Sequence, residues 1–437
     1  MGNVSKSFSL LLILILAASS LIIAIATMPI GLAQSGTNVS GIISSDTTWT
    51  QANSPYTLTG PVAVNKGAIL TIEPGASVYG GVSYYIQVNG TLIAEGTSSS
   101  QIILSVQIQF TSVSNSWNQQ TGTGSIIENA LYPNVTITGC SPKIDSNILY
   151  GLQIQQASPT ISDNRIGWEI LLIQSSAIIV NNSLSQGIEV YGGSPSILNN
   201  TVTSSYDEST NDAAIVITGG SPVIADNMIK SRIDTEPANP FMPSRQIIYP
   251  GIVIGADNAL IADNVIDDCL TGITSLGPSV TIENNFIKGS ETDGIDVTGG
   301  NAIVQSNTIT SNQIGINSPS GSSVIAYNNI YGNGYNVYLT SPNNISATNN
   351  WWGTTDQQAI NQTIYDFKNN FNLGTVNFVP FLTTPNSQAI PNPNAPILTT
   401  ASTPTPTVPE FPAWIILPLF VVMLLSIVFA RKRNRVR

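Results

Sequence analysis

The segments NALIADNVI at residues 258–266 and SVTIENNFI at residues 279–287 are two copies of one nine-residue pattern. Variants of this pattern recur along the chain, and each contains an asparagine that aligns with Asn264. Most successive asparagines are 17 to 22 residues apart, and two intervals are longer, at 27 and 37 residues. The aligned asparagines are Asn147, Asn164, Asn182, Asn200, Asn227, Asn264, Asn285, Asn307, Asn328 and Asn349.

An aliphatic residue stands three positions before and two positions after the aligned asparagine, as with Ile261 and Ile266 around Asn264. The last copy departs from this rule, because Ser346 stands three positions before Asn349. A glycine-led strand such as GIVI or GIDV follows in most copies. One copy is too small to bury its own isoleucines, so the pattern predicts stacked coils of parallel strands about 4.8 Å apart. The asparagines are expected to adopt the left-handed conformation of a sharp corner and to hydrogen-bond along the stack.

The repeats resemble the right-handed parallel β-helix proteins of the pectate-lyase-like superfamily. Residues 49–97 resemble the entry coils of exported members, and NNWWGT at 349–354 resembles a closing segment. The resemblance implies an all-β fold, with a right-handed parallel β-helix (a solenoid) over residues 45–382. It does not imply one activity, because this fold hosts lyases, hydrolases, epimerases, adhesins and surface proteins.

The composition excludes several classes of function. The chain has no histidine, so Ser-His-Asp, Cys-His and histidine-metal chemistry are all excluded. Residues 35–411 contain all 25 acidic residues but only eight of the 14 basic ones. Such a surface repels phosphate backbones, so nucleic acid is not an expected partner.

The two ends of the chain predict a membrane protein with an extracellular solenoid. Residues 1–34 are typical of a signal peptide, with an uncleaved anchor as the alternative. Residues 412–430 carry no charge and are long enough for a transmembrane helix. The basic residues of 431–437 are then cytoplasmic, which predicts a single-pass protein of the cell membrane.

Between the solenoid and the predicted helix, residues 383–411 are rich in proline and threonine, which is typical of a semi-rigid stalk. The tripeptide Pro409-Glu410-Phe411, followed by the apolar segment and the basic tail, resembles the PEF-type sorting signals of archaeal surface proteins. This resemblance implies an archaeal protein with a processed anchor.

Both long repeats carry their insertion in the same connection, after the strand that follows the asparagine, so stacking should place these loops side by side. Acidic residues recur at this connection in four consecutive coils and form a candidate ligand or calcium site. The alternative is a hydrophilic flank whose acids point apart into solvent. The candidate calcium ligands are Asp267 and Asp268, and the candidate ligand-binding residues are Asp207, Glu208, Asp212, Asp234, Glu236, Glu291 and Asp293.

The first hypothesis for function is a structural or adhesive protein that presents its sheet face to cell-surface glycans or envelope proteins, without a cofactor. The alternative is a calcium-dependent polysaccharide lyase or a glycoside hydrolase that acts at the acidic loops of residues 204–268. The pair Asp267-Asp268 is similar to the paired aspartates of polygalacturonase-type hydrolases, and Arg232 or Arg245 would be the base of a lyase. No other motif of these enzymes is matched.

Overall fold

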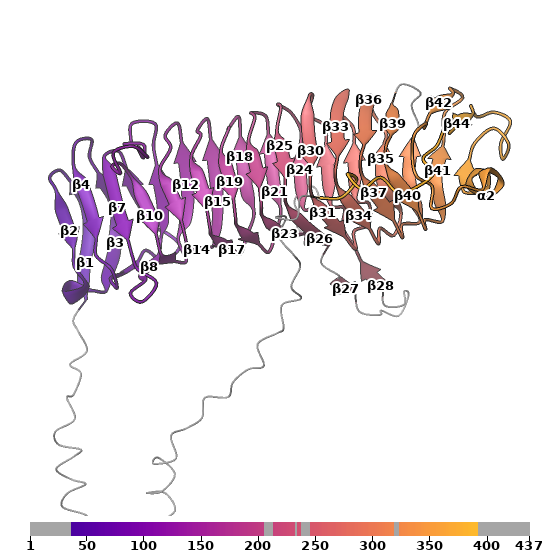
Figure 1. Cartoon of the computed structure of the whole chain (residues 1–437). Coiled ribbons are helices and arrows are strands. Elements are labelled where there is room, and N and C mark those ends of the chain that lie inside the picture. The colour runs from indigo at the N-terminus through magenta and orange to yellow at the C-terminus, as the bar shows by residue number, and fades with distance from the viewer. Residues whose placement is uncertain (1–35, 205–212, 232–233, 237–244, 319–322, 392–437) are drawn as a thin grey trace, which may run out of the picture. The chain divides into compact units, whose positions relative to one another are not determined.

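The computed structural model describes residues 36–204, 213–231, 234–236, 245–318 and 323–391. These residues form stacked coils in which parallel strands lie one above another (Figure 1). A complete coil contributes one strand to each of three rows, which we name row 1, row 2 and row 3 in chain order. The prediction of a parallel β-helix is confirmed.

Row 1 is a 15-stranded parallel sheet, and its strands precede the asparagine turn. Its strands are β2 (Thr47–Trp49), β4 (Ile69–Ile72), β7 (Thr91–Glu95), β10 (Ile126–Glu128), β13 (Lys143–Asp145), β16 (Thr160–Ser162), β19 (Ile178–Val180), β22 (Ser196–Leu198), β25 (Val223–Ala225), β30 (Ala259–Ala262), β33 (Ser279–Glu283), β36 (Asn301–Gln305), β39 (Val324–Ala326), β42 (Ile345–Ser346) and β44 (Val376–Asn377).

Rows 2 and 3 belong to one 27-stranded sheet, because the long strand β3 (Tyr56–Val64) pairs with β1 (Thr37–Ile43) and with the first strand of each row. The strands of row 2 are β5 (Ser77–Tyr79), β8 (Ile102–Ser105), β11 (Ala130–Leu131), β14 (Ile148–Leu149), β17 (Arg165–Ile166), β20 (Ser183–Leu184), β23 (Thr201–Ser204), β26 (Met228–Ser231), β31 (Val265–Asp267), β34 (Phe286–Lys288), β37 (Thr308–Thr310) and β40 (Asn329–Tyr331). The strands of row 3 are β6 (Tyr85–Val88), β9 (Gln107–Phe110), β12 (Asn134–Thr138), β15 (Gly151–Gln155), β18 (Ile170–Ile173), β21 (Ile188–Tyr191), β24 (Ile215–Ile217), β29 (Ile252–Ile254), β32 (Ile273–Ser275), β35 (Asp293–Val297), β38 (Ile314–Ser318), β41 (Tyr335–Leu339) and β43 (Ile364–Tyr365).

A few elements lie outside the three rows. An antiparallel hairpin of β27 (Asp234–Glu236) and β28 (Arg245–Ile247) lies within the second insertion. The short 3-10 helix η1 spans Gln51–Asn53 and the α-helix α2 spans Gln357–Gln362. Among the described residues, no helix is long and apolar enough to cross a membrane. The predicted span at 412–430 lies outside the described residues, as do residues 1–34.

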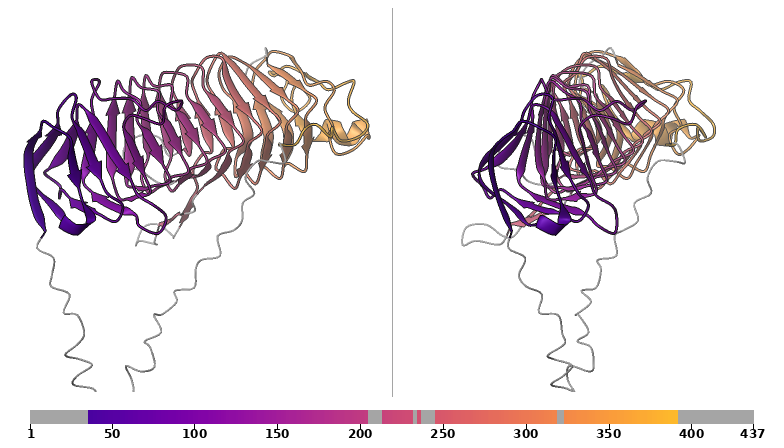
Figure 2. Two further views of the ribbon diagram at one scale, coloured as in Figure 1. Left: turned by 60° about the vertical axis from the view of Figure 1, so that its left-hand side comes forward. Right: turned by 90° about the vertical axis from the view of Figure 1, so that its left-hand side faces the viewer.

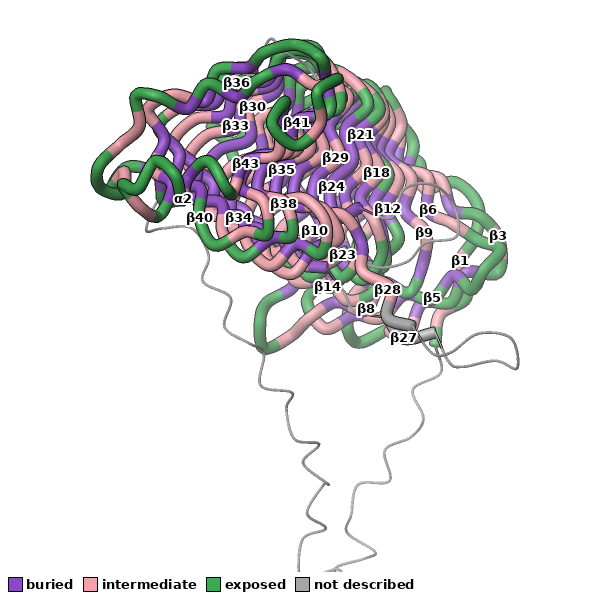
Figure 3. Tube along the Cα trace, turned by 90° about the vertical axis from the view of Figure 1, so that its right-hand side faces the viewer, coloured by how far each residue is buried: buried purple, intermediate pink, exposed green. Residues whose placement is uncertain are grey.

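In most strands buried and more exposed residues alternate, and the buried ones stack on like residues of the next coil (Figure 3 shows the burial). The isoleucines predicted to precede the asparagine turn form one such column, and their side chains are at most 1% exposed. The column includes Ile144, Ile161, Ile179, Ile197, Ile224, Ile261, Ile282 and Ile325. Row 1 faces one side of each coil and row 3 another, so residues on their outer faces belong to separate surfaces (Figure 2).

The aligned asparagines form a continuous buried ladder. The Asn264 backbone N–H and Nδ2 both donate to Oδ1 of Asn285, at 3.0 and 2.9 Å. Nδ2 of Asn264 also donates to the Ile224 carbonyl, at 2.8 Å, so the side chain ties its own coil to both neighbours. The expected hydrogen bonding along the stack is therefore confirmed.

Two details of the turn prediction are wrong. In the last coil the ladder residue is Asn350, not Asn349, because Oδ1 of Asn350 accepts from the Asn328 N–H at 2.8 Å. This shift places Ala347 and Trp352 at the two aliphatic positions, and both are buried, which explains the apparent exception at Ser346. In addition, the residue with the left-handed backbone conformation is not the ladder asparagine but the residue before it. These residues are Ser146, Asp163, Asn181, Asn199, Asp226, Asp263, Asn284, Ser306, Tyr327 and Asn349.

The first part of the predicted stalk packs on the solenoid. The Asn386 N–H donates to Oδ1 of Asn329 at 2.7 Å, and Nδ2 of Asn329 donates to the Asn386 carbonyl at 3.0 Å. The Thr308 hydroxyl donates to the Ala389 carbonyl, and Ala389 is fully buried. We name residues 386–389 the strap, because they bind β37 and β40 side by side.

Candidate functional site

The predicted acidic connection contains ion pairs instead of stacked like charges. Asp267 lies between Lys230 and Lys288 in the strand register of consecutive coils. The Lys288 ammonium is 3.3 Å from a carboxylate oxygen of Asp267, and the Lys230 ammonium is 3.1 Å from one of Asp268. These lysines relieve the repulsion on which the calcium hypothesis depended.

The other predicted ligand residues do not form one cluster within the described part of the chain. Asp234, Glu236 and Arg245 belong to the β27–β28 hairpin, where Glu236 and Arg245 are cross-strand partners. Glu291 is exposed in a loop. The described residues contain no group of three or more Cys, Asp or Glu side chains arranged to hold a metal ion. Asp207, Glu208, Asp212 and Arg232 lie outside the described residues, and calcium binding at Asp267 and Asp268 stays a prediction.

Asp293 lies elsewhere, on the outer face of row 3. In β35 both Gly294 and Ile295 are buried, so Asp293 and Asp296, three residues apart, are both on the outer face. The register with β38 is constant across this irregularity, since Asp293 pairs with Ile314 and Ile295 with Ile316, so both strands carry it at the same place. The same burial pattern recurs in β41, where Tyr335 and Tyr338 take the two outer positions.

Glycines allow these bulged strands to stack closely. A Cβ atom on Gly294 would lie 2.8 Å from the Gly315 carbonyl oxygen, and one on Gly315 would lie 2.7 Å from the Asn336 carbonyl oxygen. Any larger residue at either position requires the backbones to move apart. The glycine-led pattern of the sequence is therefore what holds the two carboxyl groups of β35 on one surface.

The two carboxyl groups are partly removed from water. Burial raises the pKa of Asp293 to about 6, the neighbouring Asp296 carboxylate adds to this rise, and a hydrogen bond from Asn317 opposes it. Burial also raises the pKa of Asp296, against a 3.1 Å hydrogen bond from the Thr298 hydroxyl. Near neutral pH the pair therefore holds a proton more readily than ordinary aspartates.

Three hydrogen-bond acceptors at this place have no partner. They are Oδ1 of Asp293, Oδ1 of Asp296 and Oδ1 of Asn317, and all three atoms are buried. Asn317 is the register partner of Asp296 in the next coil, so the acceptors lie in adjacent strands. A buried acceptor without a donor costs roughly 1–3 kcal/mol, so a ligand donor gains binding energy here once a side-chain rotation exposes the acceptor to it.

Three tyrosines continue the same surface. Tyr338 is the register partner of Asn317, and Tyr365 is the register partner of Tyr338. The rings of Tyr338 and Tyr365 stack with centroids 4.2 Å apart, and Tyr335 packs edge-on against both, at 5.7 and 5.6 Å. We name Asp293, Asp296, Asn317, Tyr335, Tyr338 and Tyr365 together the carboxyl–tyrosine face.

Sequence reasoning identified only Asp293 of these six residues and assigned it to the wrong surface. The signal that it missed is the recurrence of glycine or asparagine one position after the strand begins, in DGIDV, IGINS and YNVYL. That recurrence marks the bulge and hence the pair of outer positions.

A second aromatic pair lies at the edge of row 3 nearer the N-terminus, in the turns that precede β15 and β18. The rings of Tyr150 and Trp168 are stacked, with centroids 6.0 Å apart and an interplanar angle of 5°. They line a shallow cavity of about 220 Å³ together with Gln153 and other polar residues. Gln153 occupies the same register column as Asp296, several coils away.

Comparisons with known proteins agree on the fold. Residues 250–373 match the family model described as the right handed beta helix region. This match confirms the predicted right-handed β-helix for that part of the chain. Comparison of the sequence with curated proteins gives no match.

Two solved structures show the level of similarity. A mutant of the periplasmic alginate epimerase AlgG is 13% identical, with 78% of this chain and 85% of that chain covered and a TM-score of 0.38. The A-module of the Azotobacter vinelandii mannuronan C-5 epimerase AlgE4 is 12% identical, with 82% of this chain and 91% of that chain covered and a TM-score of 0.20.

Proposed function

We propose that this protein is a glycan-binding β-helix of the cell surface and that the carboxyl–tyrosine face holds the sugar units. The observation that supports this proposal best is the set of three buried, unpartnered acceptors beside the tyrosine cluster. Sugar hydroxyls are donors that such acceptors need, and the apolar faces of sugar rings pack on aromatic side chains.

The charge of the face favours neutral sugars. Two carboxyl groups lie together, and the described residues of the face include no lysine or arginine. An ionised uronate would meet like charge at neutral pH. Neutral glycans are therefore the preferred ligands at pH 7, and uronates gain affinity only when acid protonates the pair.

The row geometry suits an extended chain. Strands of row 3 stack at a spacing of about 4.8 Å, which is close to the length of one sugar unit in a linear glycan. The pair Tyr150–Trp168 and the carboxyl–tyrosine face share the outer side of this row. A glycan that lies along the row would contact both, in keeping with an adhesive role for a protein tethered by a C-terminal membrane helix.

The experiment is a binding assay with fragment 36–391 on immobilised neutral and uronic-acid polysaccharides. We expect binding of a neutral glycan that Tyr338→Ala weakens at least tenfold. The matched control is Tyr79→Ala, which removes an exposed tyrosine of row 2 and should leave binding unchanged. Absence of binding to every neutral glycan, or equal loss in both variants, would refute the proposal.

A second candidate function is general acid–base catalysis on the bound glycan. It is favoured by one observation, the pKa of Asp293 raised to about 6 beside a second carboxyl group. We therefore propose Asp293 and Asp296 as the site of the enzyme alternative, in preference to the ion-paired Asp267 and Asp268. New reducing ends released from a bound neutral glycan, and lost in Asp293→Asn, would support it. Binding without product would leave the adhesive function.

A further inference from the structure

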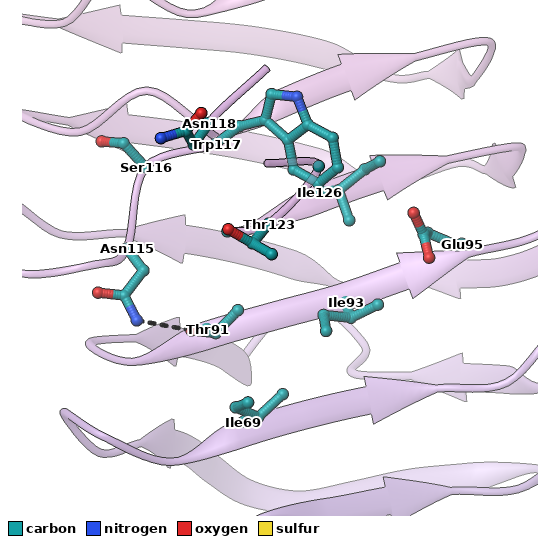
Figure 4. Close-up of a pocket in the computed structure, with 12 residues that line it drawn as sticks. Ile69, Thr91, Ile93, Glu95, Asn115, Ser116, Trp117, Asn118, Thr123 and Ile126 are labelled. Carbon is teal, nitrogen blue, oxygen red and sulfur yellow. Dashed lines mark hydrogen bonds between the residues drawn. The ribbon is translucent and has the colours of Figure 1, made fainter. Parts of the chain in front are cut away.

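A second cavity lies on row 1, far along the chain from the carboxyl–tyrosine face. The loop of residues 111–125 connects β9 to β10 and folds over the outer face of β4, β7 and β10 (Figure 4). It encloses a half-open groove of about 450 Å³, which we name the Trp117 groove. This volume lies within the roughly 300–1,000 Å³ of small-molecule sites.

Hydrogen bonds hold the loop in place. Nδ2 of Asn115 donates to the Thr91 hydroxyl at 2.7 Å (dashed in Figure 4). The backbone N–H of Trp117 donates to the Ser141 carbonyl at 2.9 Å. The tip closes on itself, because the Asn118 N–H donates to the Thr123 carbonyl at 2.7 Å. The groove is therefore formed before any ligand arrives, which lowers the entropic cost of binding.

The walls of the groove combine one aromatic face with an aliphatic floor. Ile69, Ile93 and Ile126 line it from the three strands, and the Trp117 indole stands beside Ile126 (Figure 4). Ile93 and Ile126 are register partners, so their side chains form a continuous apolar strip. Ile126 is already 1% exposed, whereas Ile69 and Ile93 are partly exposed, so these two are the isoleucines that a ligand in the groove could cover.

The rim of the groove is polar but contains no available cation. Glu95, Asn115, Asn118 and Thr123 line the rim. The Lys143 ammonium lies over the Trp117 ring, 5.8 Å from its centroid, but it is also 2.9 Å from Glu128 and 3.1 Å from Asp145, so two carboxylates already neutralise it. An anionic ligand would have to compete with these carboxylates, whereas hydroxyl groups find a carboxylate and amide groups.

We propose that the Trp117 groove is a separate binding site for one or two neutral hexopyranose units. The C–H face of the sugar ring packs on the indole and on the partly exposed Ile69 and Ile93, and its hydroxyls bond to Glu95 and the amides of the rim. Because the groove is on row 1 and the carboxyl–tyrosine face is on row 3, this site does not depend on the function proposed above.

The test uses the full chain and two probes, cellobiose and cellobiuronic acid, followed by calorimetry and by the indole N–H signals in NMR spectra. We expect saturable cellobiose binding that shifts the Trp117 indole signal and weakens at least tenfold in Trp117→Ala. The uronic acid should bind at least tenfold more weakly than cellobiose.

Two further variants keep the test decisive. Glu95→Gln, at an exposed rim position, should weaken cellobiose binding two- to fivefold even if Trp117→Ala does not fold. Tyr338→Ala, on row 3, should leave the Trp117 shift unchanged, which separates this site from the carboxyl–tyrosine face. No shift of the Trp117 signal at saturating cellobiose, or tighter binding of the uronic acid, would overturn the proposal.

Discussion

From Asn147 to Asn350, one buried asparagine in each coil satisfies the backbone at the corner between row 1 and row 2. Asn264 shows what this side chain does. Its Oδ1 accepts from the Asn227 N–H and Nδ2, each at 3.0 Å, and its Nδ2 donates to the Ile224 carbonyl at 2.8 Å. No water reaches these groups, since both asparagines are fully buried. The ladder is therefore a structural feature, and its asparagines are not candidates for ligand binding.

Removal of one ladder side chain should be costly. Asn264→Ala leaves two donors of Asn227 and one carbonyl without partners, so we expect the free energy of unfolding to fall by about 2–4 kcal/mol. The measurement is denaturant unfolding of fragment 36–391. The control is Asn301→Ala, at an exposed position, which should change stability by less than about 0.5 kcal/mol. Equal effects of the two variants would argue against the ladder as a stabilising element.

The raised pKa of Asp293 predicts a pH-dependent effect on stability. With a folded pKa of about 6 against an ordinary 3.8, the native state favours the protonated carboxyl. The contribution of the protonated Asp293 carboxyl to the free energy of unfolding is therefore complete below about pH 4 and is lost as the pH rises through 6. Asp293→Asn should exceed the wild type in stability by about 1 kcal/mol at pH 8, after allowance for partial exposure, and should match it at pH 3.5.

Thermal melts across this pH range check the prediction for Asp293. The matched variant is Glu291→Gln, which lies two residues away in an exposed loop and should show no such pH-dependent difference. A constant difference between Asp293→Asn and wild type from pH 3.5 to pH 8 would show that burial does not control this carboxyl group.

At the scale of elements, the corner turns and the bulged strands decide where side chains point. Each corner needs one residue with positive φ, and this residue precedes the ladder asparagine. Asparagine, aspartate and serine tolerate that conformation, but in one coil the position holds Tyr327, with a φ of 59°. Tyr327 is half exposed and its side chain is not part of the core.

This tyrosine should be replaceable with a gain in stability. A bulky residue in the left-handed conformation costs about 1–2 kcal/mol relative to glycine, so Tyr327→Gly should raise the free energy of unfolding by about 0.5–1 kcal/mol once the greater freedom of unfolded glycine is included. The control is Tyr331→Gly in strand β40, which should lower stability, because glycine weakens a strand interior. A loss of stability in Tyr327→Gly measured by thermal melting would contradict this account.

The whole solenoid is a stack in which each coil contacts mainly its neighbours. Disturbance at one place should therefore stay local, as in other repeat proteins. The strap offers a direct test, because the hydrogen bonds of Asn386 and Ala389 reach Thr308 of β37, Asn329 of β40 and the nearby Tyr327 carbonyl. The two binding surfaces proposed above belong to different parts of this stack.

Truncation of the strap should loosen only the C-terminal coils. In fragment 36–382, amide hydrogens of β37 and β40 should exchange at least tenfold faster than in fragment 36–391, because four side-chain and backbone contacts are lost. Amides of β15, in the N-terminal half, serve as the internal control and should exchange at the same rate in both fragments. Faster exchange throughout the solenoid would contradict the local model.

The repeat, the stacking of parallel coils and the buried isoleucine column can all be predicted from the sequence. They follow from the regular spacing of like residues, because a shift of one residue between coils would turn the isoleucines from the core to the surface. It also identified nine of the ten ladder asparagines. The tenth, at Asn350, escaped because two asparagines are adjacent there and only the register with Asn328 distinguishes them.

Which charged side chains form ion pairs became clear only from the folded coils. Asp267 looked like one step of an acidic column, but Lys230 and Lys288 stand at the same repeat position in the neighbouring coils, and their ammonium groups pair with Asp268 and Asp267. Asp293 and Asp296 share a face because of a bulge at Gly294 that no simple alternation of residues predicts. The repeat predicts which positions stack, but where a strand bulges and which way its side chains point depend on close backbone contacts between coils, which the spacing of like residues does not describe.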